Sequence, residues 1–530
     1  MKALIMPSRS SRGTVASIGY ASGPLFVIDV PAAAEYAPSG NPDVEASRLK
    51  AALAQAATEV VALAANAPGA GADILEFQQA MIEDESLSEP ALRAIAGGLD
   101  AAAAWRAALE VEIEGYVASD NEYFRARSSD LADIRDRVLR ILSGGTEARP
   151  PQGAVIFGRD LTPSQFLATN WTGGGAIILS EGSPASHVAM LARARGVPML
   201  VGVGDMQAAN DDVVLVDAEH GRIVVLPDTD DRHEFLKAST EYRLLMVAAR
   251  GLLGKPSVTT DGVGVDLFVN VAEPGDVDHI DIAHCDGVGL MRTEFLFSRG
   301  LPDEETQVAA YSKVLKWAAG KPVTIRTVDA GGDKPVPGFT VEEGNPFLGL
   351  RGIRLCLNRP EVFRVQIRAL LRAATAGNLK VMFPMVSIVA EYEAARALFV
   401  EEARTLGVPV PPLGIMVEVP SVAIAPAPFT DVAFFSIGSN DLTQYVMAAA
   451  RDNGAVASLN DPRNPAVLSL IRAVADFGEA HGIPVSLCGD AGGDQAVIPH
   501  LLKAGLRQLS VAPAQLALAK AAIARASAYG

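Results

Sequence analysis

Cysteine is scarce in this chain, with Cys285, Cys356 and Cys488 as the three thiols among 530 residues. Thiols so few and so far apart cannot build the disulfide framework of a small secreted protein or the spaced pairs of a zinc cluster. The simplest interpretation is a protein of a reducing, cytoplasmic compartment. Six of the seven histidines also lack metal-ligand spacing, and the seventh, His187, belongs to a motif treated below.

Long apolar runs and excess basic charge are also missing. No stretch of roughly twenty apolar residues is free of charges or of glycine and proline breaks, so we expect no membrane-spanning helix. The first residues, MKALIMPSRSSRG, lack the apolar core of a signal peptide. Forty-five basic residues against sixty-two acidic ones give a net charge of −17. This balance argues against a protein that coats nucleic acid or anionic lipid, although a local basic pocket remains compatible with it.

The composition that remains is that of a globular protein. Hydrophobic residues make up 49% of the chain and charged residues 20%, which excludes a wholly disordered or fibrous class. At roughly 150 residues per domain, the length corresponds to three or four domains.

The N-terminal half alternates between two kinds of pattern. Short β-branched runs around glycine turns occur in residues 1–42 and again in 145–227, which predicts one small α/β domain. Between them, residues 43–144 contain an alanine-rich stretch with apolar residues at helical spacing and three further helical stretches, one of them from Ser88 to Ser119. These four stretches predict a helical bundle inserted into that domain. The charged amphipathic segment 228–256 predicts a helical linker.

Residues 257–530 alternate between strand and helix patterns. Eight apolar strand segments, each followed by a helical one, match the length of a (β/α)₈ barrel. The alternative is an open doubly wound sheet, but no glycine-rich dinucleotide fingerprint follows the first strand. The predicted fold class is therefore α/β, with a C-terminal barrel and an N-terminal α/β domain that carries the helical insertion.

Polar residues follow the predicted barrel strands at the ends where barrel enzymes place their active sites. Any one of them could be a strand terminator, but six on one rim indicate a site; they are Arg292, Arg326, Glu418, Asn440, Asp441 and Cys488. Glu418 and Asp441 end consecutive strands, and neighbouring strands lie about 5 Å apart. The two carboxylates can therefore share one hard cation such as Mg²⁺.

The remaining rim residues indicate the kind of ligand. Arg292, Arg326 and Arg451 supply fixed positive charge that pairs with phosphate or carboxylate, so we expect a small, multiply charged anion that chelates magnesium. Cys488, in the sequence SLCGD, is a candidate general acid or nucleophile. The alternative for Cys488 is a small buried apolar side chain.

A second candidate site lies in the sequence EGSPASHVAMLARARGVPML. His187 follows a Gly-Ser-Pro-Ala-Ser turn and opens an apolar helix. Free backbone N–H groups at a helix N-terminus favour an anion, and a neutral histidine nitrogen is a nucleophile. Taken alone, a single histidine is more often structural or simply exposed.

Several motifs resemble those of one known family. GSPASHVAMLAR resembles the phosphohistidine motif of phosphoenolpyruvate-utilising enzymes. The barrel adds GLMRTEFLF, RTVDAGGDK, NPFLGLRGIR, MVEVPS, FFSIGSNDLTQYVMAAAR and SLCGDAGGD. The domain order is similar to that of the enzyme I family of the bacterial phosphotransferase system, and the match spans essentially the whole chain.

The resemblance implies a two-step phosphoryl transfer. His187 attacks the phosphorus of phosphoenolpyruvate bound with Mg²⁺ at the barrel rim, pyruvate leaves as an enolate, and the phosphoryl group passes to a histidine of an HPr-like phosphocarrier docked on the helical insertion. By the same resemblance Glu418 and Asp441 hold the metal and Cys488 protonates the enolate. The resemblance also implies that phosphoenolpyruvate is bound by Asp441 and by five further residues: Arg292, Arg326, Asn440, Arg451 and Arg354. It also implies a homodimer formed through the barrel.

Three residues depart from the family pattern. Ala185 and Val188 stand where small hydroxyl residues usually flank the histidine, and Asp490 shortens the usual Cys-Gly-Glu by one methylene. The first two bear on the lifetime of phosphorylated His187, and the third on side-chain reach near Cys488. None removes an essential charge or nucleophile.

Three other functions compete with this one. A pyruvate phosphate dikinase or phosphoenolpyruvate synthase would also need a nucleotide-binding domain, and neither room for one before the first strands nor a P-loop is found. A non-catalytic phosphorelay or regulatory protein would not need the complete rim set. A barrel lyase would leave His187 and the helical insertion without a purpose. Without an N-terminal sensory domain, sugar transport is favoured over nitrogen regulation.

Overall fold

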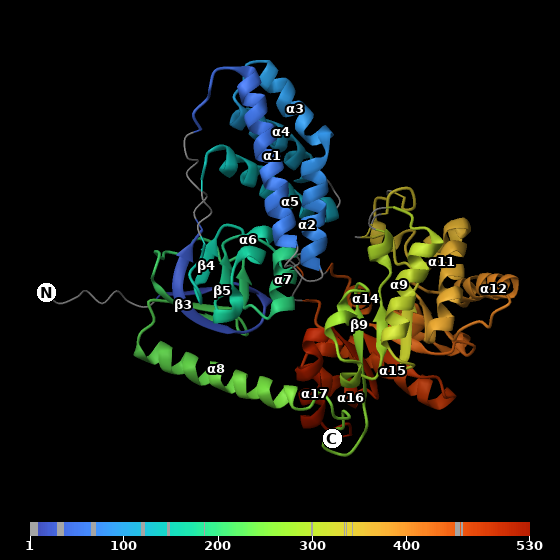
Figure 1. Cartoon of the computed structure of the whole chain (residues 1–530). Coiled ribbons are helices and arrows are strands. Elements are labelled where there is room, and N and C mark those ends of the chain that lie inside the picture. Colours follow the sequence, from blue (N-terminus) through green and yellow to red (C-terminus); the bar gives the residue numbers. More distant parts are fainter. Residues whose placement is uncertain are drawn as a thin grey trace. The chain divides into compact units, whose positions relative to one another are not determined.

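The structure is a computed structural model that divides into two compact units, residues 1–244 and 245–530 (Figure 1). It describes residues 9–28, 36–64, 70–117, 122–145, 149–184, 186–297, 300–332, 334, 336–341, 343–450, 456 and 459–529. For residues 70–74, 117, 122–127, 129, 187 and 194 it describes the backbone alone. Each unit has its own hydrophobic core and is described by itself.

The first unit contains an eight-stranded sheet in the order β1-β8-β7-β3-β4-β5-β6-β2. Its strands come from both sides of the helical insertion: β1 (Arg9–Arg12), β2 (Thr14–Ser17), β3 (Tyr20–Val27), β4 (Val155–Gly158), β5 (Ala176–Leu179), β6 (Met199–Val201), β7 (Val213–Asp217) and β8 (Arg222–Val225). The parallel pairing of β3 with β4 joins the two segments, because Leu25 lies opposite Val155 across the insertion. Helices α6 (Pro163–Ala168) and α7 (His187–Arg195) follow β4 and β5.

The insertion contains five described helices where the sequence pattern predicted four. They are α1 (Pro42–Ala64), α2 (Ala70–Glu83), α3 (Glu85–Ala96), α4 (Ala101–Val117) and α5 (Glu122–Leu142). The stretch predicted as one helix from Ser88 to Ser119 is divided because Gly97 and Gly98 end α3, and Gly98 has a φ of 101° that favours glycine. The core of the bundle contains Trp105, which is fully buried among leucine, isoleucine and alanine side chains.

Helix α8 (Thr229–Arg250) occupies the predicted linker, and the division between the units falls within it. In the first unit, Tyr20 packs against Phe235 and Tyr242, with ring centroids 5.7 and 5.4 Å apart. In the second unit, Ala249 is buried in a small cluster with Ala517 and Ala521. Each end of α8 is therefore anchored to a different core.

The second unit is a closed barrel of eight parallel strands in the order β10-β11-β12-β13-β14-β15-β16-β9. The barrel prediction is confirmed, and the open sheet is excluded. The strands are β9 (Asp266–Val271), β10 (Val288–Met291), β11 (Pro322–Arg326), β12 (Asn378–Phe383), β13 (Leu413–Val417), β14 (Phe435–Gly438), β15 (Val485–Cys488) and β16 (Gln508–Val511). The surrounding helices are α9 (Glu304–Trp317), α10 (Ile353–Asn358), α11 (Pro360–Ala373), α12 (Val389–Leu406), α13 (Pro420–Ile424), α14 (Ser439–Met447), α15 (Pro465–His481), α16 (Ile498–Lys503) and α17 (Leu516–Arg525).

The barrel strands are apolar because they are covered on both sides. Their outward side chains, such as Ile415, Phe435 and Leu487, join the main core under the helices. The inward ones form a separate small cluster of Leu290, Met382, Met416, Phe434 and Cys488. This cluster lies inside the barrel, and the charged residues predicted for the site lie at or just after the ends of the strands. Among the helices that the structure describes, none combines the length and apolar composition that a bilayer crossing requires.

Candidate active site

The predicted rim residues follow the strands at one end of the barrel. Glu418 comes directly after β13, and Asp441 lies in the first turn of α14, directly after β14. These strands are parallel neighbours, with Ile415 opposite Phe435. The fifth and sixth strands of the barrel therefore place both acidic residues at the same end, as the sequence predicts.

Glu418 is fully buried, and one of its two carboxyl oxygens lacks a hydrogen-bond partner among the described residues. Its Oε1 accepts a hydrogen bond of 2.6 Å from the backbone N–H of Met385, whereas its Oε2 has no hydrogen-bond partner among the described residues. Burial, followed by the nearby charge of Asp441, raises the pKa of Glu418 to about 8. A buried, unpartnered carboxylate oxygen needs a proton or a cation, so this position suits a metal ligand.

Asp441 is held by an arginine that sequence reasoning missed. Arg351 is fully buried and donates from Nη1 and Nη2 to the two carboxylate oxygens of Asp441, at 3.3 and 3.2 Å. It also donates from Nε and Nη2 to Asp329, at 3.0 and 3.1 Å. Burial opposes the positive charge, but these carboxylates outweigh it and keep the pKa of Arg351 above its usual value.

Arg326, at the end of β11, extends this buried network. Its guanidinium lies 3.1 Å from Glu294 and 3.2 Å from Asp329, and its Nη1 also contacts the Met416 sulfur at 3.6 Å. Lys334 adds a further cation 3.3 Å from Asp329. The rim thus carries alternating cations and carboxylates in a buried position, which strengthens their interactions with one another and with any charged ligand.

A glycine allows the loops of the network to approach closely. Gly352 has a φ of 57°, and a side chain there would come within 3.0 Å of Met385 and 3.3 Å of Asp329. Met385 itself has a φ of 58°, which is uncommon for a residue with a side chain. This backbone conformation accompanies the N–H of Met385 that bonds Glu418, consistent with strain held at a functional site.

Cys488 ends β15 with its thiol in the apolar interior of the barrel. It is 2% exposed, and the hydroxyl of Ser436 donates to its Sγ at 3.2 Å. Burial raises the pKa of the thiol, although the bond from Ser436 and the charge of Arg326 act in the opposite direction. Cys488 is therefore a thiol at neutral pH, which is the form that can donate a proton.

Asn440 is fixed by a pair of reciprocal hydrogen bonds. Its Nδ2 donates to Asp490 at 3.1 Å, and its Oδ1 accepts from the backbone N–H of Asp490 at 3.0 Å. The shorter acidic side chain at position 490 thus reaches Asn440 directly, and this contact ties the end of β15 to α14.

The sequence predicts three further arginines as substrate-binding residues. Arg292 directly follows β10 and is exposed, while its backbone N–H bonds the carbonyl of Val271. Arg354 lies on α10 and pairs with Glu391 at 3.2 Å and with Ser387 at 3.1 Å. Arg451 lies outside the described residues.

The predicted histidine site has a well-defined backbone. His187 is the first residue of α7, and Ser186 caps the helix by accepting a hydrogen bond from the N–H of Ala189. Arg193, one turn further, donates to the carbonyls of Ala16 and Pro184, both at 2.8 Å, and so fastens the preceding turn to the sheet. The side chain of His187 and the residue Ala185 lie outside what the structure describes.

Val188, one of the departures from the family pattern, is 3% exposed and packs in the core beneath α7. Its apolar side chain therefore stabilises the helix that carries His187.

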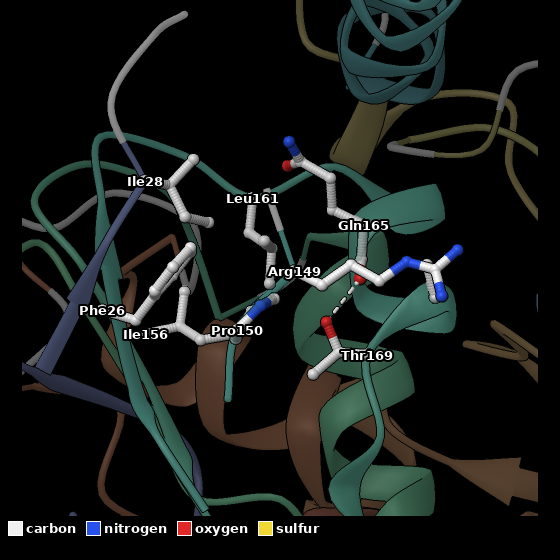
Figure 2. Close-up of a pocket in the computed structure, with 9 residues that line it drawn as sticks. Phe26, Ile28, Arg149, Pro150, Ile156, Leu161, Gln165 and Thr169 are labelled. Carbon is white, nitrogen blue, oxygen red and sulfur yellow. Dashed lines mark hydrogen bonds between the residues drawn. The ribbon is translucent and has the colours of Figure 1, made fainter. Parts of the chain in front are cut away.

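The first unit also contains a hollow lined by Phe26, Ile28, Ile156 and Leu161, with Arg149 nearby (Figure 2). In its wall, the Thr169 hydroxyl donates to the carbonyl of Gln165 at 2.7 Å. The lining is mostly apolar and has a single charged side chain, so it lacks the converging charges of the barrel rim.

The described side chains also bear on whether the chain can hold a metal ion. Within the described part of the chain, no three His, Cys, Asp or Glu side chains converge in a group that could hold a metal. Magnesium does not need such a group, because it commonly uses one or two carboxylates and completes its shell with water and phosphate oxygens. Glu418 and Asp441 are the carboxylates that the rim offers.

Three family models match the chain. The PEP-binding domain of PEP-utilising enzymes matches residues 248–528, their N-terminal domain matches 12–127, and their mobile domain matches 150–221. A phosphoenolpyruvate-protein phosphotransferase of Geobacillus stearothermophilus is 37% identical over 97% of this chain and 92% of its own length. The chain belongs to the phosphoenolpyruvate-protein phosphotransferase family. This family membership confirms the resemblance predicted from the motifs and the classification as an enzyme.

A second relative has the same name. A phosphoenolpyruvate-protein phosphotransferase of Listeria innocua is 35% identical over 98% of this chain and 94% of its own. Among solved structures, an NMR structure of an enzyme I protein is 25% identical, covering 44% of this chain and 99% of its own with a TM-score of 0.36.

Proposed function

We propose that this chain transfers the phosphoryl group of phosphoenolpyruvate to His187 and then to a histidine of an HPr-like phosphocarrier protein. The observation that carries this proposal is the buried network of cations and carboxylates at the barrel rim, in a chain of the phosphoenolpyruvate-protein phosphotransferase family. A substrate with a phosphate and a carboxylate attached to the same carbon needs such closely spaced positive charges.

The rim cations hold and orient the substrate. Arg292 and Arg326 end neighbouring strands, so their guanidinium groups are suited to the phosphate and the carboxylate of phosphoenolpyruvate. Asn440 is already oriented by Asp490 and offers its amide as a further donor. The sequence motifs add Arg354 and Arg451, and the contacts of Arg351 make it a stronger candidate than Arg354 because it bonds Asp441 directly.

Glu418 and Asp441 are the proposed ligands of Mg²⁺. The unpartnered Oε2 of Glu418 and its raised pKa fit a group that exchanges a proton for a cation. When bound, Mg²⁺ supplies positive charge that withdraws electrons from the phosphate and the enolate oxygen. In the absence of the cation, Arg351 compensates the negative charge of Asp441, while the raised pKa of Glu418 keeps that neighbouring group mostly protonated at pH 7.

Two groups carry the chemical steps. The imidazole of His187 attacks the phosphorus, and the P–O bond to the enolate oxygen breaks. The thiol of Cys488 then gives its proton to the methylene carbon of the enolate, which becomes the methyl group of pyruvate. The apolar surroundings of Cys488 keep this proton on the sulfur until the basic enolate carbon is formed.

The partners and the location belong to the same proposal. The helical insertion, α1 to α5, is the proposed docking site of the phosphocarrier, and the barrel is the proposed contact of a homodimer. We place the protein in the cytoplasm, where it would feed a phosphotransferase system for sugar uptake or regulation.

Release of pyruvate tests this function directly. With phosphoenolpyruvate, Mg²⁺ and a histidine phosphocarrier present, a coupled assay for pyruvate should show continuous turnover. Without the carrier, release should stop after one equivalent of pyruvate per active site. A regulatory protein without turnover would release no pyruvate under either condition, and that result would refute the proposal.

A further inference from the structure

The hydroxyl of Ser436 is a polar group in an apolar place. Ser436 lies on β14 and is fully buried, next to the interior cluster formed by Leu290, Met382, Met416, Phe434 and Cys488. A buried hydroxyl without a partner costs free energy, and alanine would fill nearly the same space without that cost. Within the described residues, the hydroxyl of Ser436 reaches the Sγ of Cys488, at 3.2 Å.

The strand register explains why this serine meets the thiol. In the parallel pairing of β14 and β15, Ser436 lies opposite Ser486 and Gly438 lies opposite Cys488. Ser436 and Gly438 are two residues apart on β14 and therefore share one face of the sheet, and on that face the thiol of Cys488 meets the serine hydroxyl. Ser486, in contrast, donates to the backbone carbonyl of Phe435 at 3.4 Å.

We propose that Ser436 is a positioning residue that holds and stabilises the thiol of Cys488 as it protonates the enolate. This inference rests on the proposed function, in which Cys488 is the proton donor. In that step the S–H bond breaks, a C–H bond forms with the electron pair of the enolate double bond, the enolate becomes the ketone of pyruvate, and the sulfur is left as a thiolate. Solvent later returns the proton to the sulfur.

The hydrogen bond contributes most at the transition state. A hydroxyl donates more strongly to a thiolate than to a thiol, so the bond from Ser436 strengthens as negative charge develops on the sulfur. It also limits rotation of the thiol, because Sγ is held between the serine and the apolar side chains below it. Removing the hydroxyl should therefore lower kcat for pyruvate formation and leave KM for phosphoenolpyruvate nearly unchanged.

A double-mutant cycle tests this inference. Ser436→Ala should slow pyruvate formation roughly 10- to 100-fold, the range expected for one hydrogen bond to a charged group. It should leave transfer from phosphorylated carrier to His187 unchanged. The matched control, Ser486→Ala, removes a neighbouring hydroxyl that does not bond the thiol and should behave like wild type. In a Cys488→Ala background, Ser436→Ala should have no additional effect, because the serine acts through the thiol.

The outcomes separate this inference from the proposed function. A wild-type kcat for Ser436→Ala would overturn the positioning role. An equal fold-loss of kcat from Ser436→Ala in the presence and in the absence of Cys488 would overturn it as well. Either result leaves the proposed function intact. Full pyruvate formation by Cys488→Ala alone would refute the proton-donor role and the role of Ser436 with it. Melting temperatures of all variants, measured beside the rates, show whether a slow variant is simply less folded.

Discussion

At the scale of single residues, Glu418 is the group whose chemistry depends most on its surroundings. With a pKa of about 8, it is mostly protonated at pH 7 when no cation is present. A cation that binds its carboxylate must therefore displace this proton. Proton release on metal binding thus reports on Glu418 independently of catalysis.

Magnesium binding should consequently become tighter as the pH rises from about 6 to 8 and level off above pH 8. Isothermal titration calorimetry in buffers of different ionisation enthalpy measures the proton released at pH 7. Glu418→Gln should abolish both the binding and the proton release, and should slow phosphoenolpyruvate use by at least about 100-fold. Binding of equal strength at pH 6 and 8 would contradict this assignment.

The same residue affects stability without metal. A carboxyl group whose pKa is raised in the folded state favours folding below its unfolded pKa, and this contribution is lost as the pH rises toward the folded value. Glutamine cannot ionise, so Glu418→Gln should melt at a higher temperature than wild type at pH 8.5 without Mg²⁺. Near pH 5 the two should melt alike, and a lower melting temperature for the variant at both pH values would be inconsistent with the raised pKa.

Arg351 is the residue that the sequence motifs contained but did not single out. Arg351→Lys keeps one charge but loses the bidentate contacts with Asp329 and Asp441, and should lower kcat/KM for phosphoenolpyruvate roughly 10- to 100-fold. The matched variant Arg354→Lys alters an arginine that pairs with Glu391 instead, and should lower kcat/KM for phosphoenolpyruvate less. Steady-state kinetics of the two variants measure this difference. A larger loss of kcat/KM for Arg354→Lys would favour Arg354, the substrate-binding residue predicted from the sequence.

At the scale of elements, hydrophobic periodicity predicted the barrel well. All eight strand segments are present, because a strand buried on both sides is a short apolar run bounded by polar residues. The same rule located Glu418, Asp441 and Cys488, since each lies at or just after the end of such a run.

Arg351 and Asp329 lie in the long connection after β11, whose path periodicity does not determine. The pattern predicts one helix in place of α3 and α4, because periodicity alone does not mark the break at Gly97 and Gly98.

The helical insertion contains a buried acidic residue that stabilises it. Glu45, near the start of α1, accepts hydrogen bonds from Tyr36 and from the backbone N–H groups of Ser39 and Ala101. Burial alone would raise its pKa, but these bonds outweigh burial and lower it to about 2. The stabilisation is therefore present above the unfolded pKa near 4.5 and is lost as the pH falls toward 2.

Glu45→Gln should weaken these contacts and destabilise the insertion at pH 7 by about 1–3 kcal/mol. Hydrogen exchange at the start of α1 and α4 should become faster, while exchange in the barrel stays unchanged. Glu89→Gln, which changes an exposed residue paired with Arg93, is the matched control and should alter exchange very little. Equal exchange in the two variants would contradict the role of Glu45.

At the scale of the whole molecule, the two units should work as separable halves. We predict that swivelling around residues 228–256 brings His187 alternately to the barrel site and to the carrier, because one arrangement does not suit both transfers. A covalent clamp between the halves should block one transfer. Normal rates for both transfers in a clamped protein would contradict swivelling.

The contacts of the end of α8 and of the residues just after it indicate where to divide the chain. Lys520 donates to the carbonyls of Leu253 and Lys255, both at 2.6 Å, and Ala249 packs on α17. A fragment that starts at residue 245 keeps these contacts and should melt at a higher temperature than one that starts at 256. It should bind phosphoenolpyruvate and Mg²⁺ but transfer no phosphate, whereas a fragment of residues 1–244 should exchange phosphate with the carrier alone. Equal melting temperatures for the two barrel fragments would show that residues 245–255 add nothing to the stability of the barrel.

The most direct test of the central claim is to locate the phosphate on the protein. Incubation with phosphoenolpyruvate labelled in its phosphoryl group, with Mg²⁺ and without carrier, should give one acid-labile, base-stable label per chain. Peptide mapping should place that label on His187, and His187→Ala should fold normally and take up none. A label on another residue, or full labelling of the His187→Ala variant, would contradict the account.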